Sequence, residues 1–224
     1  MSKTIGILGG MGMFATINFL KEFMNKWTNV YNVEKEWDYP KYILHANPKL
    51  PSRSRHIFYD EESPLEILKK DIIQLNSNNI DFIVMPCNTV HYYYKELQKI
   101  SDVEILNMIE IVSNYLIKLS YGKIYVIGTE AIVKTKLYNN YGLNELEYCE
   151  NITSVRKIID SVKNNNVNEE IHCLFKDILS KDLCNLICCT ELSKLFSENK
   201  DIFKDYTILD PVDIFIEHII QIYK

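Results

Sequence analysis

Short apolar runs alternate along the chain with longer amphipathic segments, a pattern typical of βα units and of parallel sheets. The expected strands span residues 4–8, 39–45, 81–85, 104–106, 123–127, 145–148, 185–188 and 207–209. The expected helices span residues 14–27, 64–76, 90–99, 109–120, 130–139, 154–164, 168–180, 192–198 and 211–222. The pattern therefore predicts an α/β fold in which helices flank mainly parallel sheets.

Four of the expected strands end in small or polar residues that lead directly into a helix. These turns are residues 9–12, 87–89, 128–129 and 189–191. A glycine turn precedes a cysteine turn in each half, which predicts two similar Rossmann-like lobes related by a pseudo-twofold axis. We expect residues 1–106 and 205–224 in the first lobe and 107–204 in the second. Ligands bind beyond the carboxyl ends of parallel strands, so the predicted site lies between the lobes.

The composition of the chain argues against several classes of protein. The chain has 224 residues and a net charge of −5, and its pI of about 5.6 argues against a nucleic-acid-binding surface. The apolar runs are strand-sized, so we expect no membrane span. The N-terminus enters a strand at once and leaves no room for a signal peptide, so the expected location is the cytoplasm. The six cysteines lack the paired spacing of a zinc site, so we expect buried thiols and no metal.

Two cysteines carry the main chemical signal. Cys87 and Cys189 each end an apolar run where a helix begins. The helix dipole and free backbone N–H groups there are expected to lower a thiol pKa from about 8.5. Two such thiols on opposite sides of one molecule can remove a proton from one face and return one to the other, which is racemase or epimerase chemistry without a cofactor. Cys188 is a rival to Cys189, because successive strand residues point to opposite faces.

Other polar residues near these turns have two interpretations each. Asn88 and Thr89 can cap the following helix or bind a carboxylate. Arg53, which we place on a proline-stiffened loop, can bind a carboxylate bidentately or lie free on the surface. His91 is expected to support its turn rather than carry a proton. Glu191 can orient the neighbouring thiol, accept its proton, or simply stabilise the start of a helix.

The first glycine turn is also open to several interpretations. Gly10-x-Gly12-x-x-Ala15 matches a dinucleotide-binding fingerprint, with Glu34 downstream. That acid does not end a second strand, as the fingerprint requires. The same glycines can cradle an anion at a helix N-terminus or serve a purely structural turn. A nucleotide-binding module thus remains an alternative to an enzyme.

Taken together, the motifs resemble those of the aspartate/glutamate racemase family, and the aspartate branch most of all, over nearly the whole chain. The matching motifs are the glycine turn at 5–12, Ala-Thr at 15–16, Asn-Pro-x-x-Pro-x-Arg at 47–53, Pro-Cys-Asn-Thr-x-His at 86–91, Gly-Thr at 128–129, Cys-Thr-Glu at 189–191 and Asp-Pro at 210–211. The chain departs from the family at Cys188, where the family usually has Gly. Glu191 stands where the glutamate branch has His.

The resemblance implies an enzyme that interconverts L- and D-aspartate without pyridoxal phosphate or any other cofactor. Cys87 and Cys189 would carry the protons, with His91 and Glu191 supporting them. The substrate, a dicarboxylic amino acid, would be held by Met11, Gly12, Arg53, Asn88, Thr89, Thr129, Lys163 and Thr190. The resemblance also implies a homodimer. A member of the same family acting on glutamate, a hydantoin or maleate is the nearest alternative.

Overall fold

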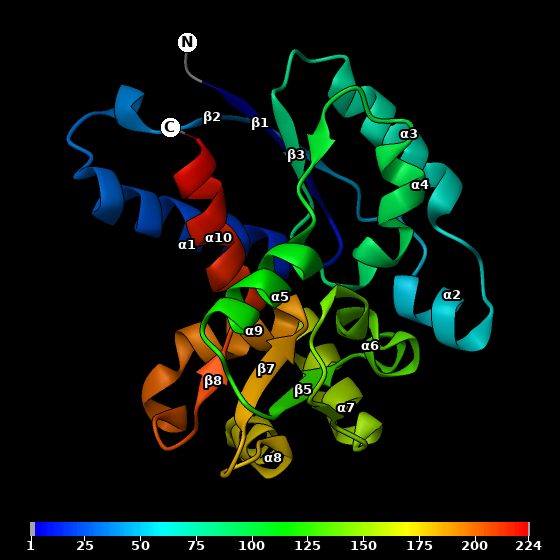
Figure 1. The fold of residues 1–224 in the computed structure, drawn as a ribbon, viewed down its shortest axis with the longest axis vertical. Helices are drawn as coiled ribbons and strands as arrows, with labels where there is room; N and C mark the ends of the chain where they lie inside the picture. Colours follow the sequence, from blue (N-terminus) through cyan, green and yellow to red (C-terminus); the bar gives the residue numbers. More distant parts are fainter. Residues whose placement is uncertain (1–2, 224) are drawn as a thin grey trace.

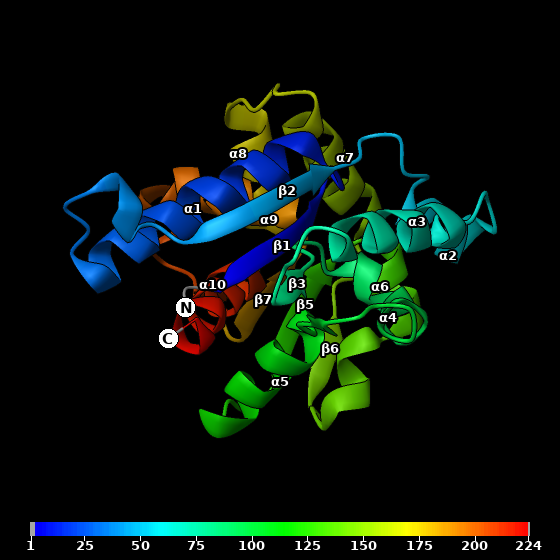
Figure 2. The ribbon, with the colours of Figure 1, turned by 90° about the horizontal axis from the view of Figure 1, so that it is seen from above.

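The computed structural model describes residues 3–223, which form two four-stranded parallel sheets flanked by helices (Figures 1 and 2). The first sheet has the order β2-β1-β3-β4, and its strands are β1 (Thr4–Gly9), β2 (Lys41–Ala46), β3 (Phe82–Val84) and β4 (Glu104–Ile105). The second has the order β6-β5-β7-β8, and its strands are β5 (Ile124–Gly128), β6 (Leu146–Tyr148), β7 (Cys184–Cys188) and β8 (Ile208–Leu209). The predicted α/β fold with two similar lobes is confirmed.

The α-helices match most of the expected segments. They are α1 (Met13–Tyr31), α2 (Arg53–Tyr59), α3 (Leu65–Asn76), α4 (Tyr94–Gln98), α5 (Met108–Lys118), α6 (Glu130–Thr135), α7 (Ile152–Lys163), α8 (Glu169–Ile178), α9 (Thr190–Glu198) and α10 (Pro211–Ile222). The helix expected at 90–99 begins as a 3₁₀ helix, Thr89–Tyr93, before α4. The one expected at 130–139 stops at Thr135, because Lys136 adopts a left-handed conformation with φ of 45°. Helix α2 was not predicted.

The two sheets are joined by a reciprocal exchange of helices. Helix α5 follows β4 of the first sheet and packs against the 3₁₀ helix Leu137–Tyr141 of the second half. Helix α10 follows β8 of the second sheet and packs against α1 of the first half, and α5 and α10 lie side by side at the centre (Figure 1). The Tyr223 hydroxyl donates to the Lys3 carbonyl at 2.6 Å, so both ends of the described chain meet at the first half.

This topology corrects one lobe boundary. Strand β8 pairs with β7, at Asn185↔Ile208 and Leu186↔Leu209, whereas the sequence pattern predicts that residues 205–224 belong to the first lobe. The chain therefore returns to the first half after Leu209, because β8 is hydrogen-bonded into the second sheet and α10 alone crosses back. The rest of the proposed division stays a prediction.

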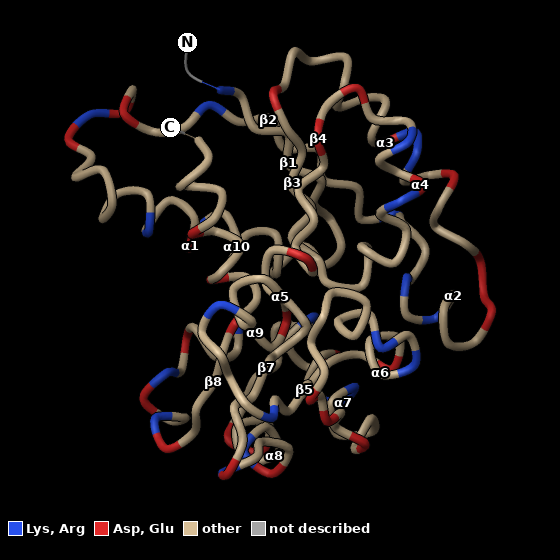
Figure 3. The backbone as a smooth tube through the Cα atoms, in the orientation of Figure 1, with Lys and Arg blue, Asp and Glu red and all other residues tan. Residues whose placement is uncertain are grey.

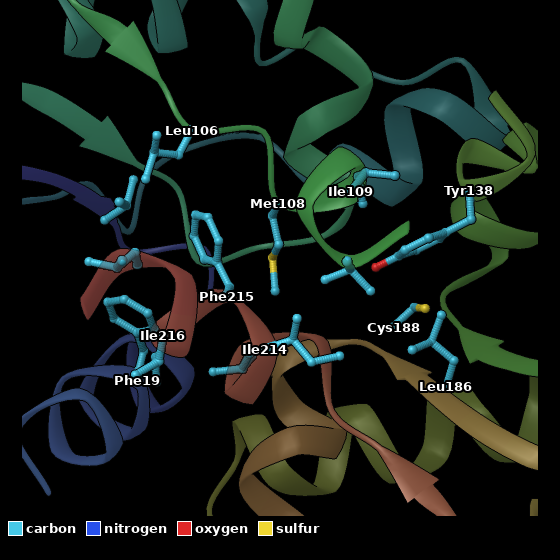
Figure 4. Close-up of a cluster of buried hydrophobic side chains, with 14 of the residues drawn as sticks. Phe19, Leu106, Met108, Ile109, Tyr138, Leu186, Cys188, Ile214, Phe215 and Ile216 are labelled. Atoms are coloured by element: carbon cyan, nitrogen blue, oxygen red, sulfur yellow. The ribbon is translucent and has the colours of Figure 1, made fainter. Parts of the chain in front are cut away.

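A continuous apolar core fills the space between the sheets. It combines side chains from α1, α5, α10 and β7, including Phe19, Met108, Phe215 and Leu186 (Figure 4). Full burial of such a side chain stabilises the fold by about 1.5–3 kcal/mol. Because both halves contribute to this core, their relative position is held by packing, and so is any site between them.

The outer surface carries both charge signs. Lys and Arg are interspersed with Asp and Glu over both halves of the molecule (Figure 3). Within residues 3–223, none of the helices combines the length and apolar character needed to cross a membrane.

Candidate active site

A cavity of about 160 Å³ lies between the two halves, at the carboxyl ends of their strands. Its walls are formed by Met11, Ser52, Arg53, Ser54, Arg55, Cys87, Asn88, Thr89, Thr129, Glu130, Arg156, Ile159, Asp160, Lys163, Cys188, Cys189, Thr190 and Glu191. Most of the predicted site residues are among them. The exceptions are Gly12 and His91, which do not line the cavity.

The two cysteine turns have the same local geometry. The Cys87 N–H donates to the Met85 carbonyl at 2.7 Å, and the Cys189 N–H donates to the Ile187 carbonyl at 2.9 Å. Each tight turn follows the third strand of its sheet, so the pseudo-twofold relation of the sheets brings both turns to the same cavity. Both thiols are free and nearly buried, with 6% and 7% of each residue exposed.

The environment of Cys189 corrects the expectation of a lowered pKa. Its thiol donates to Glu191 Oε2 at 3.1 Å. Burial, and then the negative charge of Glu191, raise the pKa of Cys189 well above its ordinary value, while the nearby Lys163 charge opposes them. The helix start was expected to dominate, but desolvation and the adjacent carboxylate outweigh the Lys163 charge and the backbone N–H of Glu191.

Glu191 is itself buried, with 4% of the residue exposed. Its Oε2 also accepts from the Thr190 hydroxyl at 3.4 Å, whereas Oε1 has no hydrogen-bond partner among the described residues. Gly12 makes room for this carboxylate, since a Cβ on Gly12 would stand 2.6 Å from Oε1. Contact of Gly12 with a substrate stays a prediction.

Gly10 serves the packing of the glycine turn. Its φ is +88°, and a Cβ there would stand 2.5 Å from the backbone nitrogen of Asn47. The turn therefore closes against the chain that follows β2. This close approach explains the glycine without a bound nucleotide.

His91 holds the first cysteine turn in place. Its Nδ1 donates to the Cys87 carbonyl at 2.9 Å, and its Nε2 accepts from the Met108 N–H at 3.1 Å. Burial lowers the pKa of His91 from 6.5 to about 4, so the ring is neutral at physiological pH. The imidazole thus connects the turn to the start of α5.

Arg53 lies on a helix and not on the expected loop. It is the first residue of α2, whose N-terminus is capped by Ser52 Oγ, the acceptor of the Arg55 N–H at 3.3 Å. The Arg53 Nη2 donates to the Met11 carbonyl at 2.9 Å. Its Nε is buried and has no partner within residues 3–223, so a donor remains available at the cavity.

The polar groups of the two halves meet at the cavity floor. The hydroxyls of Thr89 and Thr129 are 3.3 Å apart, which links the first cysteine turn to the Gly-Thr turn after β5. Cys188 also borders the cavity, but its side chain belongs to the shared core beside Tyr138 (Figure 4). Cys189 is therefore the thiol of this pair that contacts Glu191 at the site.

Sequence reasoning missed several wall residues. Arg156 on α7 forms an ion pair with Glu130 at 2.8 Å and also hydrogen-bonds the Tyr59 hydroxyl. Residues 156, 159, 160 and 163 all line the cavity, at the spacing of one helical face. Projecting that face back from Lys163 would have identified Arg156, although the choice of face needs the tertiary structure.

The fold and this interlobe cavity define a class of two-lobed α/β proteins with a cysteine from each lobe at one site. Residues 8–219 match the model of the Asp/Glu/hydantoin racemase family, so the chain belongs to that family.

Three known proteins illustrate how much of the chain is similar in sequence and in structure. The Picrophilus torridus aspartate racemase structure has a TM-score of 0.84 and 26% identity, covering 99% of this chain and 94% of that one. An aspartate racemase homologue from Pyrococcus horikoshii has a TM-score of 0.71, 19% identity and 99% coverage of both chains, which shows a shared fold. The broad specificity amino-acid racemase RacX of Bacillus subtilis is 33% identical over 138 residues, 60% of this chain and 58% of that protein.

Proposed function

We propose that this protein is an amino-acid racemase that interconverts L- and D-aspartate by proton transfer between Cys87 and Cys189. The observation that carries the proposal is that the two equivalent cysteine turns, one from each half, line a single cavity. The similarity to the Picrophilus torridus aspartate racemase supports aspartate as the substrate.

The proposed reaction uses one thiolate and one thiol. The thiolate takes the α-proton from one face of the amino acid and becomes a thiol, and the C–H electron pair moves into the α-carboxylate. The second thiol then donates its proton to the opposite face of the same carbon and becomes a thiolate. Proton count and total charge are conserved, and the reverse reaction exchanges the two roles.

The elevated pKa of Cys189 assigns the starting roles. Because burial and Glu191 favour its neutral form, Cys189 begins as the acid. Cys87 then begins as the base for one enantiomer. For the other enantiomer the thiolate must first move to Cys189, and Lys163 is the cation that favours that state.

The developing charge on the α-carboxylate requires hydrogen-bond donors aimed at it. The hydroxyls of Thr89, Thr129 and Thr190 and the amide of Asn88 border the cavity and can supply them. Arg53 and Lys163 provide positive charge for a second carboxylate, which favours a dicarboxylic substrate. A homodimer is proposed from the family resemblance, and light scattering in solution tests it.

Exchange of the α-hydrogen tests the function. The protein is incubated in D2O with L-aspartate, L-glutamate, a hydantoin and maleate in separate reactions, which are followed by proton NMR and optical rotation. We expect loss of the α-proton signal and of optical rotation with L-aspartate. Exchange with glutamate alone would change the proposed substrate from aspartate to glutamate. Exchange with no amino acid would overturn the proposal.

A further inference from the structure

Asn88 presents an unused donor to the cavity. The residue is 2% exposed, its Oδ1 accepts from the Tyr138 hydroxyl, and its Nδ2 finds no partner in the described part of the chain. A buried donor without a partner costs about 1–3 kcal/mol, so the amide nitrogen is placed for a ligand. A side-chain amide has an acceptor oxygen and a donor nitrogen. A protein partner that bonds to the oxygen therefore leaves the nitrogen for the ligand, and the reverse.

Tyr138 reaches Asn88 from the other half of the molecule. It lies on the 3₁₀ helix Leu137–Tyr141 and is fully buried in the shared core, which also contains Cys188 (Figure 4). A tyrosine hydroxyl can either donate or accept. If it accepted from the amide nitrogen instead, Asn88 would turn its oxygen toward the cavity and repel a carboxylate.

The structure selects the first of these arrangements. The Tyr138 hydroxyl donates to Asn88 Oδ1, and burial raises the pKa of Tyr138 well above its ordinary value, so the hydroxyl keeps the proton that it donates. The Asn88 oxygen is therefore occupied, and the amide nitrogen is the end left without a partner among the described residues.

We propose that Tyr138 is a positioning residue that aims the Asn88 amide donor at a carboxylate of the bound amino acid. This inference rests on the proposed function. It adds a residue from the second half to a binding group of the first half, so the orientation of Asn88 depends on correct assembly of both.

The first test compares two tyrosine variants. Tyr138→Phe removes the hydroxyl and keeps the ring, and Tyr148→Phe is the matched control, because its hydroxyl donates to Asn139 Oδ1 at 2.7 Å in an exposed pair. We expect Tyr138→Phe to lower kcat/KM for aspartate about fivefold to tenfold, the loss of one oriented hydrogen bond. Tyr148→Phe should keep the wild-type value, and circular dichroism checks that both variants fold.

A double-mutant cycle separates positioning from a structural role. In an Asn88→Ala background, Tyr138→Phe should change kcat/KM by less than about twofold, because the amide that it orients is gone. An equal loss in both backgrounds, or wild-type kinetics in Tyr138→Phe alone, would overturn the inference. Should Tyr138→Phe not fold, Asn88→Asp decides: it keeps an acceptor for the Tyr138 hydroxyl but replaces the amide donor, so it should lower kcat/KM for aspartate, and unchanged kinetics overturn the inference.

Binding distinguishes failure of the inference from failure of the proposed function. Wild-type protein that exchanges no amino acid in D2O overturns the function. Calorimetry with succinate, which carries two carboxylates and is not turned over, then tests the positioning by itself. Weaker succinate binding by Tyr138→Phe than by Tyr148→Phe supports the inference; equal binding, or no binding to the wild type, overturns it.

Discussion

The two cysteine turns are held in place by different side chains, a histidine in the first half and a serine in the second. Four residues after each cysteine, a buried side chain bonds to the cysteine carbonyl: His91 Nδ1 to Cys87 at 2.9 Å, and Ser193 Oγ to Cys189 at 3.3 Å. Each then connects to the helix that crosses to the other half. His91 accepts from the first N–H of α5, whereas Ser193 donates to Asp210, the N-cap of α10, at 2.7 Å.

We call the His91–Met108 and Ser193–Asp210 contacts the two links. They differ in the pKa shifts of their titratable groups, His91 and Asp210. Burial lowers the pKa of His91 to about 4, and burial raises the pKa of Asp210 from 3.8 to about 7. The second turn also has Glu191 two residues after its cysteine, where the first has Thr89. Pseudo-symmetry of the backbone therefore does not make the two thiols equivalent, and four predictions test how far they differ.

The largest expected effect comes from the thiols themselves. Cys87→Ser and Cys189→Ser should each lower the rate of aspartate racemisation by about 10²- to 10⁴-fold, the usual contribution of a positioned acid or base. Cys173→Ser, which alters an exposed thiol, serves as the control. Polarimetry measures the rates. Near-normal activity of either site variant would remove that cysteine from the mechanism.

Stability against pH should separate the two links. His91 is protonated more readily in the unfolded chain, so its contribution rises between pH 4 and 6.5 by about 3 kcal/mol. Asp210 binds its proton more tightly when folded, so its contribution falls by about 4 kcal/mol between pH 3.8 and 7. In the wild type, these two opposite pH dependences of the unfolding free energy nearly cancel.

Removing one link should expose the other. Relative to the wild type, the unfolding free energy of His91→Gln should fall as pH rises from 4 to 7, and that of Asp210→Asn should rise. Urea titrations at several pH values measure both slopes. Parallel slopes in the two variants would contradict the opposed titration.

Glu191 should account for part of the high pKa of Cys189. Glu191→Gln removes the adjacent negative charge while keeping a neutral acceptor, so the pKa of Cys189 should fall and its alkylation by iodoacetamide at pH 8 should be several-fold faster. Glu198→Gln on the same helix is the control, because Glu198 is exposed and paired with Lys194. Mass spectrometry of the Cys189 peptide gives the rate; an unchanged rate would assign the shift to burial alone.

The smallest expected effect concerns Gly12. Gly12→Ala places a methyl group against Glu191 and should cost about 1 kcal/mol of stability, as mild overpacking does. Gly122→Ala, where no heavy atom lies within 4 Å, should leave stability unchanged. Thermal melts compare the two, and equal melting temperatures would mean that Glu191 moves aside freely.

The site was predictable to the extent that its residues lie at strand ends. Cys87, Asn88 and Thr89 follow one buried strand and Cys189 and Thr190 another, so their convergence followed from parallel topology. Helix α2 was not predictable in this way, because it has seven residues and depends on contacts such as His56 Nδ1 to the Tyr93 hydroxyl at 2.6 Å. Its misassignment placed Arg53 on a loop.

Period-2 and period-3.6 patterning by itself determined the eight strands, most helices and the placing of a cysteine after the third strand of each half, because these are local consequences of which face is buried. Only the tertiary structure decided the pairing of β8, the raised pKa of Cys189 and the contact of Tyr138 with Asn88, 50 positions away along the chain. These depend on burial and on partners brought together by packing, and neither is encoded in the spacing of residues along the chain.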